Sequence, residues 1–177
     1  MSTLSVDTIQ GQTTAANVKL PAGCILQTLQ TVKTDVFEVS GAQTGIDITG
    51  LSVTITPKYS TSKVLIMFNV HIVGLDAGTG LRLLRGSTTL TMGDAAGSRA
   101  RMMATGIYAT GSDANTYSGG NTSMTFLDSP ATTSATTYKL QGQVLANGFS
   151  VNRSRYDLDN GNASRNISTI TAMEIAQ

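Results

Sequence analysis

The stretch KVLIMFNVHIV, residues 63–73, decides the fold class of this chain. In a strand, its alternation places five large apolar side chains on one face, whereas a helix would distribute them around its circumference. The residues of the opposite face are themselves partly apolar. We therefore expect a central strand that is covered on both faces. The first face carries Val64, Ile66, Phe68, Val70 and Ile72, and the second carries Leu65, Met67, Asn69, His71 and Val73.

Shorter strand-like segments recur along the rest of the chain, separated by turn residues. Pro57 ends one of them, because proline cannot donate to a strand ladder, and Gly86-Ser87 marks the turn of a hairpin. About ten short strands at near-regular spacing predict one all-β domain, a β-sandwich of jelly-roll type, rather than βαβ units. The expected strands lie within residues 25–32, 35–39, 48–57, 63–73, 81–94, 98–110, 122–128, 136–146, 147–155 and 167–176.

The composition agrees with an all-β protein and narrows the possible functions. The 177 residues include 27 Thr and 17 Ser but no Trp, and β-branched threonine favours strands over helices. Charged residues make up 13% of the chain and the formal net charge is +1. We therefore expect no nucleic-acid partner, which would require clustered Lys and Arg. The longest apolar run, residues 64–68, is too short for membrane insertion, and we expect no secretory signal.

Residues 1–23 differ from the rest and predict an N-terminal attachment arm. Leu4, Val6 and Ile9 are weakly alternating apolar residues in an otherwise polar segment, too few to form a core of their own. Such residues are useful where a segment lies extended on another protein. We predict that these three side chains dock to a particle or a neighbouring subunit, with a free tail as the alternative. Residues 24–177 are the predicted sandwich domain.

No constellation of residues predicts catalysis. His71 is the one histidine and lies within an apolar strand, where a core or interface role is expected rather than that of a general base. Cys24 is the one cysteine, expected to be a small buried side chain without an activating partner. The acidic residues are scattered over turns, where Asp usually bonds its own backbone, and Asp128 in LDSP is an example. We expect no enzyme and no cofactor.

One polar loop resembles a calcium-binding loop. DLDNGN, residues 157–162, spaces its oxygen-bearing side chains in alternation. An EF-hand loop needs Gly at its sixth position and Glu at its twelfth, whereas Gly161 stands fifth here and Ser168 stands twelfth. We expect an ordinary Asn-Gly turn and no metal.

Two loops carry the candidate binding residues. Tyr117 and Asn121 belong to the loop 111–121, and Tyr156 precedes the polar loop 157–166. An aromatic side chain beside polar ones is typical of sugar sites. We favour structural roles for the tyrosines at strand ends, and these three residues are the candidates for host contact, with a host surface glycan as the ligand.

The tract between two expected strands, residues 128–136, consists almost entirely of small and hydroxyl-bearing residues. It begins with Asp-Ser-Pro, a sequence typical of a turn. Its hydroxyl groups can bond water and neighbouring backbone groups. We therefore expect a solvent-facing connection that leads into the next strand.

Six phrases, in their order along the chain, carry a family resemblance. They are STLSVDTIQ (2–10), STSKVLIMFNV (60–70), LLRGSTTLTMGD (83–94), MTFLDSPATTSATTYKLQ (124–141), VNRS (151–154) and STITAMEIA (168–176). Together they resemble the tail-fibre-like virion proteins of marine tailed bacteriophages, including those of cyanobacteria. The resemblance covers most of residues 24–177 and, more loosely, the arm.

This resemblance implies a non-enzymatic virion protein that is made in the host cytoplasm and resides in the phage particle. It further implies a homotrimer whose N-terminal segment docks to other virion proteins of the tail or head. Long fibres of this kind carry a stalk between anchor and tip, whereas here the arm leads directly into one globular domain. A capsid decoration protein therefore remains an alternative, and a carbohydrate-binding receptor-recognition module is a further one.

Overall fold

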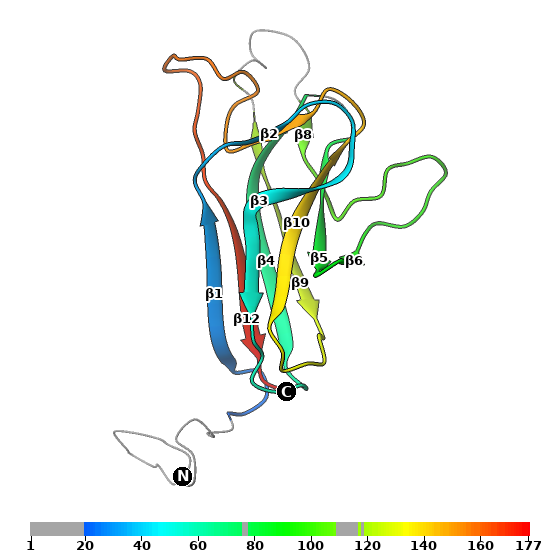
Figure 1. Ribbon diagram of the computed structural model, residues 1–177, viewed down its shortest axis with the longest axis vertical. Coiled ribbons are helices and arrows are strands. Elements are labelled where there is room, and N and C mark those ends of the chain that lie inside the picture. The colour runs from blue at the N-terminus through cyan, green and yellow to red at the C-terminus, as the bar shows by residue number, and fades with distance from the viewer. Residues whose placement is uncertain (1–19, 76–77, 109–116, 118) are drawn as a thin grey trace, which may run out of the picture.

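The described part of the protein is built from strands alone. The computed structural model describes residues 20–75, 78–108, 117 and 119–177, and no helix occurs among them. The strands form a seven-stranded and a five-stranded sheet that pack face to face, which confirms the predicted all-β sandwich (Figure 1). Sheet A contains β1 (Ile25–Lys33), β2 (Phe37–Val39), β4 (Lys63–Gly74), β8 (Ile107–Tyr108), β9 (Gly120–Asp128), β11 (Phe149–Val151) and β12 (Ser168–Ile175). Sheet B contains β3 (Gln43–Ile55), β5 (Gly80–Arg85), β6 (Thr88–Thr91), β7 (Ala104–Thr105) and β10 (Thr136–Val144).

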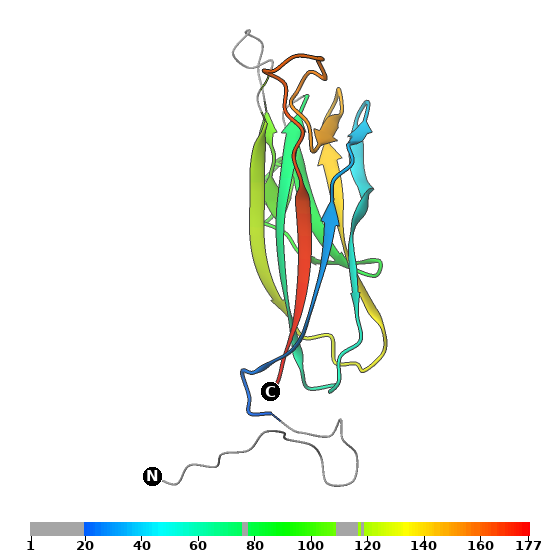
Figure 2. The ribbon, with the colours of Figure 1, turned by 90° about the vertical axis from the view of Figure 1, so that its left-hand side faces the viewer.

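The chain crosses repeatedly from one sheet to the other. Strands β1, β4, β9 and β12 lie in sheet A, whereas β3, β5, β6 and β10, which alternate with them along the sequence, lie in sheet B. The two layers are seen side by side in Figure 2. This connectivity is typical of a jelly roll, in which a strand-rich chain encloses one core between two antiparallel layers.

Strand β4 is the centre of sheet A, as predicted from its sequence. Residues 63–69 pair with β12 along one edge, and residues 64–72 pair with β9 along the other. Its last residues pair with β11 and, in parallel, with β8. Because a neighbour lies on each edge, the backbone groups of this most apolar strand are satisfied within the sheet.

The inner faces of the two sheets form a single core. The predicted apolar face of β4 is buried throughout, and Phe68, its largest side chain, is 3% exposed. Full burial of each such side chain contributes roughly 1.5–3 kcal/mol to folding. Opposite β4, sheet B contributes Leu51, Val53, Ile55, Leu81, Leu83, Tyr138 and Leu140.

Among the described residues, the second face of β4 is covered over only about half of its length, and the prediction of cover on both faces is confirmed for that half. Leu65 and Met67 are only partly buried and Asn69 is exposed, whereas His71 is 7% exposed and Val73 is buried. Covering segments reach only one end of the strand. A Cβ atom at Gly119 would lie 2.5 Å from His71 Cε1, and no described segment lies over the other half.

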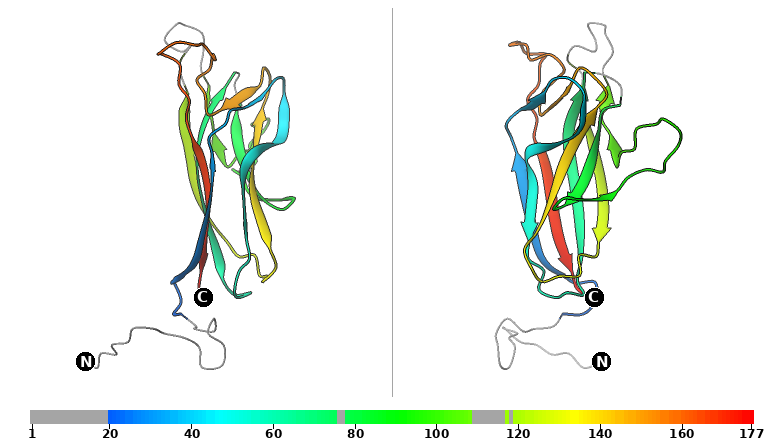
Figure 3. Two further views of the ribbon diagram at one scale, coloured as in Figure 1. Left: turned by 60° about the vertical axis from the view of Figure 1, so that its left-hand side comes forward. Right: turned by 45° about the vertical axis from the view of Figure 1, so that its right-hand side comes forward.

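The expected strand over residues 98–110 is present only as two short pieces. β7 pairs with β5 in sheet B, and β8 pairs with β4 in sheet A, so the chain changes sheets at Gly106 between them. The preceding loop, residues 92–103, extends sideways from the sandwich (Figure 3). A segment that crosses between layers cannot continue a single ladder, which is why the long strand does not form.

The sandwich has two distinct ends. Gly23 N–H donates to Ala176 O, and Ala176 N–H donates to Cys24 O, both at 2.9 Å, so the described chain begins and finishes at the same end. We call this the terminal end and the opposite one the loop end (Figures 1 and 2). Cys24 is only partly buried, which corrects the expectation of a buried cysteine and follows from its place at this rim.

Candidate functional site

The terminal end is held together by one buried carboxylate. Glu174 on β12 is fully buried and accepts hydrogen bonds from Gln27 Nε2 at 2.6 Å and from the backbone N–H of Lys58 at 2.7 Å. Burial alone would raise the pKa of Glu174, but these hydrogen bonds outweigh it and lower the pKa below its ordinary value. The carboxylate thereby joins the first strand, the last strand and the turn after Pro57 into a rigid base next to the point of chain entry.

At the loop end, the structure brings one predicted contact residue to the polar loop. Asn160 Nδ2 donates to the Tyr117 hydroxyl oxygen at 3.2 Å. Tyr156 belongs to the same loop region, is 48% exposed, and has the Arg155 guanidinium 5.3 Å from its ring centre. Asn121 is exposed but lies on β9, where it lines a different hollow. Two of the three predicted residues therefore share a region, and the third is separate from it.

The polar loop encloses a hollow of about 380 Å³. Arg165 forms an ion pair with Asp157 across the loop, and Asn162 N–H donates to Asn160 Oδ1 at 2.9 Å, a side-chain turn of the kind expected for DLDNGN. Within the described residues, no group of three or more His, Cys, Asp or Glu side chains is placed to hold a metal ion. The hollow is lined by Asp157, Leu158, Asp159, Asn160, Ala163, Ser164 and Arg165.

Beneath the loops lies a buried polar cluster that the sequence reasoning missed. Asn152 is fully buried at φ 67°. Its amide nitrogen donates to the carbonyls of Lys33 and Asp35 at 2.9 and 3.0 Å, and its amide oxygen accepts from Ser168 Oγ at 2.6 Å. Asn is tolerated in the left-handed region, where most residues are strained. Asn152, in the phrase VNRS (151–154), therefore holds the strands together beneath the loop end. That phrase was the one feature of the sequence that could have indicated this cluster.

His71 lies next to this cluster. Its backbone N–H donates to Ser168 Oγ at 3.0 Å, and its buried Nδ1 atom has no hydrogen-bond partner among the described residues. Burial lowers the pKa of the imidazole. Its ring packs against Gly119, so the arrangement resembles a core histidine, as expected, rather than a base in contact with a nucleophile.

Asp128 has a different role from the predicted one. Instead of bonding its own turn, its buried Oδ2 atom accepts from the Tyr138 hydroxyl and from Arg85 Nη1, each at 2.7 Å. Burial first, and then the bond to Asp128, raise the pKa of Tyr138. The hydroxyl-rich tract, residues 128–136, thus leads from β9 to β10. The buried hydrogen bond between Asp128 and Tyr138 joins these two strands, which belong to different sheets. Within the tract, Thr136 Oγ1 bonds the backbone of Ser134 at 3.0 Å, as expected for its hydroxyl groups.

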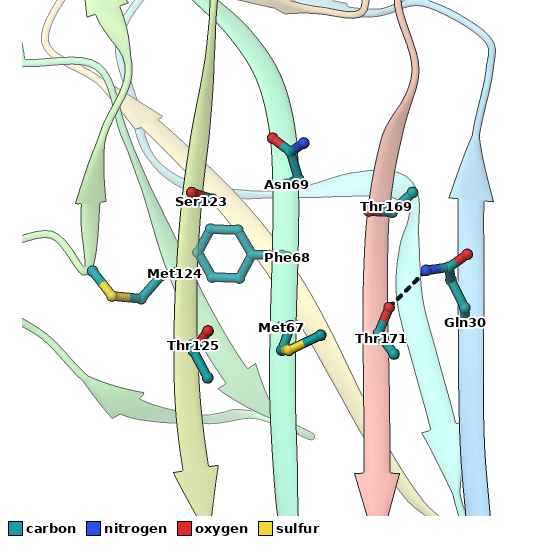
Figure 4. A pocket seen from close by; sticks show the side chains of 9 residues that line it. All are labelled: Gln30, Met67, Phe68, Asn69, Ser123, Met124, Thr125, Thr169 and Thr171. Carbon is teal, nitrogen blue, oxygen red and sulfur yellow. Dashed lines mark hydrogen bonds between the residues drawn. The ribbon is translucent and has the colours of Figure 1, made fainter.

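A further open surface is the outer face of sheet A, over the half of β4 that no described residue covers. The strand register sets out three rows across β1, β12, β4 and β9. A shallow hollow of about 530 Å³ lies at its centre, where Gln30 Nε2 donates to Thr171 Oγ1 at 2.9 Å (Figure 4). The rows are Thr28–Met173–Leu65–Leu127, Gln30–Thr171–Met67–Thr125 and Val32–Thr169–Asn69–Ser123.

Comparisons with known proteins add no family assignment. No protein-family model matches the chain, and no curated protein matches it. Within the described residues there is also no helix that is both long and apolar enough to span a membrane.

Proposed function

We propose that this protein is a non-enzymatic structural component of a tailed-bacteriophage particle, of the tail-fibre or tail-accessory type. It assembles as a homotrimer and docks to other virion proteins through residues 1–23. The sequence phrases listed above support the phage assignment. The predicted docking residues Leu4, Val6 and Ile9 lie outside the described residues, so their role stays a prediction.

The observation that carries this proposal is the separation of the two ends of the sandwich. The described chain begins at the terminal end, beside Ala176 and the base built around Glu174. The polar loop with Tyr156 and Asn160 lies at the opposite end, a full strand length away (Figure 1). An arm anchored at the terminal end therefore presents the loops outward, and the stiff sandwich holds them at a fixed distance from the particle.

The mechanism is passive. Two hydrogen-bonded sheets packed on one core provide rigidity, and uncharged Thr, Ser and Asn side chains keep exposed loops hydrated. Several copies docked together attach more tightly than one copy, because each further contact forms within an already assembled complex. A capsid decoration protein would be attached to the phage head through its arm in the same way. The two functions differ only in the virion surface to which the arm binds.

Deletion of residues 2–20 tests the docking step. We expect a folded domain that no longer joins phage particles, measured by immunoblotting of purified particles after complementation of a knockout phage. A sharper variant changes Leu4, Val6 and Ile9 together to Ser, with Thr3→Ser and Thr8→Ser as the matched control in the same segment. Normal incorporation of the deletion variant refutes docking through the arm.

A second candidate function, glycan recognition, is favoured by one observation at the loop end. Tyr156 is 48% exposed beside the polar hollow, and Tyr117 contacts Asn160 in its wall. An aromatic platform next to hydrogen-bonding groups is what sugars bind. Binding of the full-length protein to a glycan array, lost in Tyr156→Ala and in Tyr117→Ala but kept in Tyr59→Ala, supports this function. The absence of binding on an array that includes host envelope glycans contradicts it.

A further inference from the structure

The central part of the outer face of sheet A lacks the charges with which an exposed sheet usually meets water, although Lys63 lies on the same side of β4 next to the first row. None of the residues in its three rows is Asp, Glu, Lys or Arg. Val32 is 49% exposed and Leu127 is 46% exposed, and Met67 and Met173 are partly buried between them. Depletion of charge together with enrichment in methionine and aliphatic side chains is typical of the core of a protein–protein interface.

The same surface continues around β9 into a methionine-lined edge. Met124 lines the hollow on the face and also two hollows beside it, of about 550 and 310 Å³. Met92, Met102 and Met103, from the loop before β7, line these two hollows. Within the described residues β9 pairs only with β4, and its other edge carries no further strand, although Thr122 Oγ1 donates to Thr105 O at 2.8 Å there. Methionine adapts its shape to a partner, which suits such an edge to docking.

We infer that copies of this chain cover both surfaces, each copy placing its methionine-lined edge on the outer face of sheet A of the next copy. An uncharged face offers nothing to complement a strongly charged partner, whereas it meets another uncharged surface without repulsion. The pattern of β4 agrees with this assignment. Its second face, with Leu65 and Met67, has the composition of a covered strand, and a neighbouring copy supplies the cover that the described residues do not.

The size of the face favours contact through face and edge together. Three rows across four strands measure about 400 Å² in projection, from a strand spacing of about 4.8 Å and a rise of about 3.4 Å per residue. A standard interface takes about 800 Å² from each partner. The face alone is therefore too small for a stable symmetric pair. Two unlike surfaces in contact form a head-to-tail interface, which gives a ring where the rotation between neighbouring copies closes and an open filament where it does not.

The placement of the chain ends selects a ring axis along the strands. The described N-terminal residues and Ala176 lie at the terminal end, and the long strands run from it to the loop end (Figures 1 and 2). A rotation axis parallel to the strands gathers all terminal ends on one side, so that every arm reaches the same docking surface. This step deepens the proposed function and rests on it, whereas the two surfaces are inferred independently.

The test compares one exposed threonine on each outer face of the full-length protein. Thr125→Arg places a charge on the outer face of sheet A, and the matched control Thr54→Arg places it on the exposed outer side of β3 in sheet B. Sedimentation velocity and native mass spectrometry should show trimers for the wild type and for Thr54→Arg. For Thr125→Arg we expect monomers, with association weakened on the order of 100-fold because a charge is desolvated in the contact.

A second variant, Met92→Lys, tests the edge separately, because Met92 lines a hollow of the edge and not the hollow on the face. It should also give folded monomers by circular dichroism and sedimentation. A monomeric wild type overturns the inference, and so does a Thr125→Arg protein that remains trimeric. Equal dissociation of Thr54→Arg and Thr125→Arg also overturns it, because the effect would not be specific to the face. Particle incorporation is measured separately: a trimer that never enters particles contradicts the proposed function and leaves the inferred surfaces intact.

Discussion

The two outer faces of the sandwich differ in their chemistry although both sheets contribute equally apolar inner faces to one core. On sheet B, Lys139 Nζ lies 2.7 Å from Asp47 Oδ2, and Arg82 stands in the same layer opposite Gln141. The three rows on sheet A contain no charged residue. A sandwich requires only that its inner faces be apolar. The outer faces are free to follow their surroundings, which are water for sheet B and, under the proposed ring, protein for sheet A.

The same contrast divides the two faces of a single strand. On β4, Phe68 points into the core while Asn69 points outward at the next position. Charge is absent from both faces of this strand between Val64 and Asn69. The inner face is covered by sheet B, whereas no described residue covers the outer face between Leu65 and Asn69. Substitutions at neighbouring positions of β4 can therefore separate the stability of the folded monomer from the stability that assembly adds.

The largest effect is expected at Phe68. Phe68→Ala should lower the free energy of unfolding by about 3–5 kcal/mol, because a buried aromatic side chain is lost and a cavity remains. Asn69→Ala, one residue along, should change it by less than about 0.5 kcal/mol in the monomer. Urea unfolding followed by circular dichroism, performed on the monomeric Thr125→Arg background, measures both. Similar losses at both positions would contradict the one-sided burial of β4.

The next effect concerns a buried charge, in contrast to the exposed charges on sheet B. Asp128→Asn should cost about 2–3 kcal/mol, since it leaves the Tyr138 hydroxyl and Arg85 with a weaker acceptor in a buried site, although Arg85 is partly exposed. Tyr138→Phe should cost about 1 kcal/mol from the lost hydrogen bond. A double-mutant cycle between the two positions should show coupling. If the losses in the free energy of unfolding were additive, the Asp128 and Tyr138 side chains would not be energetically coupled.

The elements of the fold that were predictable from sequence are those with strong alternation. Residues 63–73 and the hairpin around Gly86 were identified, because side-chain periodicity and turn chemistry are local properties. β3 begins at Gln43, five residues before the expected start, because QTGID is polar and glycine-containing and its pairing depends on β10. The sequence of residues 43–47 alone does not indicate that this segment pairs with β10.

The functional surfaces were less predictable than the fold. Tyr117 and Tyr156 were singled out by residue type, and the structure places them in one region, but Asn121 lies elsewhere. The hydrogen-bonded cluster around Asn152 and the hydrogen bond between Asp128 and Tyr138 were missed, because each depends on contacts between residues of different strands. The open face became visible only once the register aligned residues from four strands, since no single strand shows it.

Acid should weaken the terminal end. Because hydrogen bonds lower the pKa of Glu174 in the folded state, its stabilisation is fully present above the ordinary value of 4.5 and is lost as pH falls through the folded-state pKa. At pH 7, Glu174→Gln should cost about 1–3 kcal/mol. The difference from the wild type should shrink as the pH is lowered from 5 toward 2, measured by urea unfolding. A constant difference across this range would contradict an ionised Glu174.

The smallest effect is expected for the exposed ion pair that distinguishes sheet B. The hydrogen bonds from Lys139 and Gln141 lower the pKa of Asp47, so this pair stabilises the fold above pH 3.8 and loses its effect in stronger acid. Because Asp47 is 54% exposed, Asp47→Asn should cost only about 0.2–1 kcal/mol at low salt, and less at 1 M NaCl. The same variant should leave the trimer intact in sedimentation velocity. Dissociation of the Asp47→Asn trimer would place sheet B in the interface and reverse the assignment of the two outer faces.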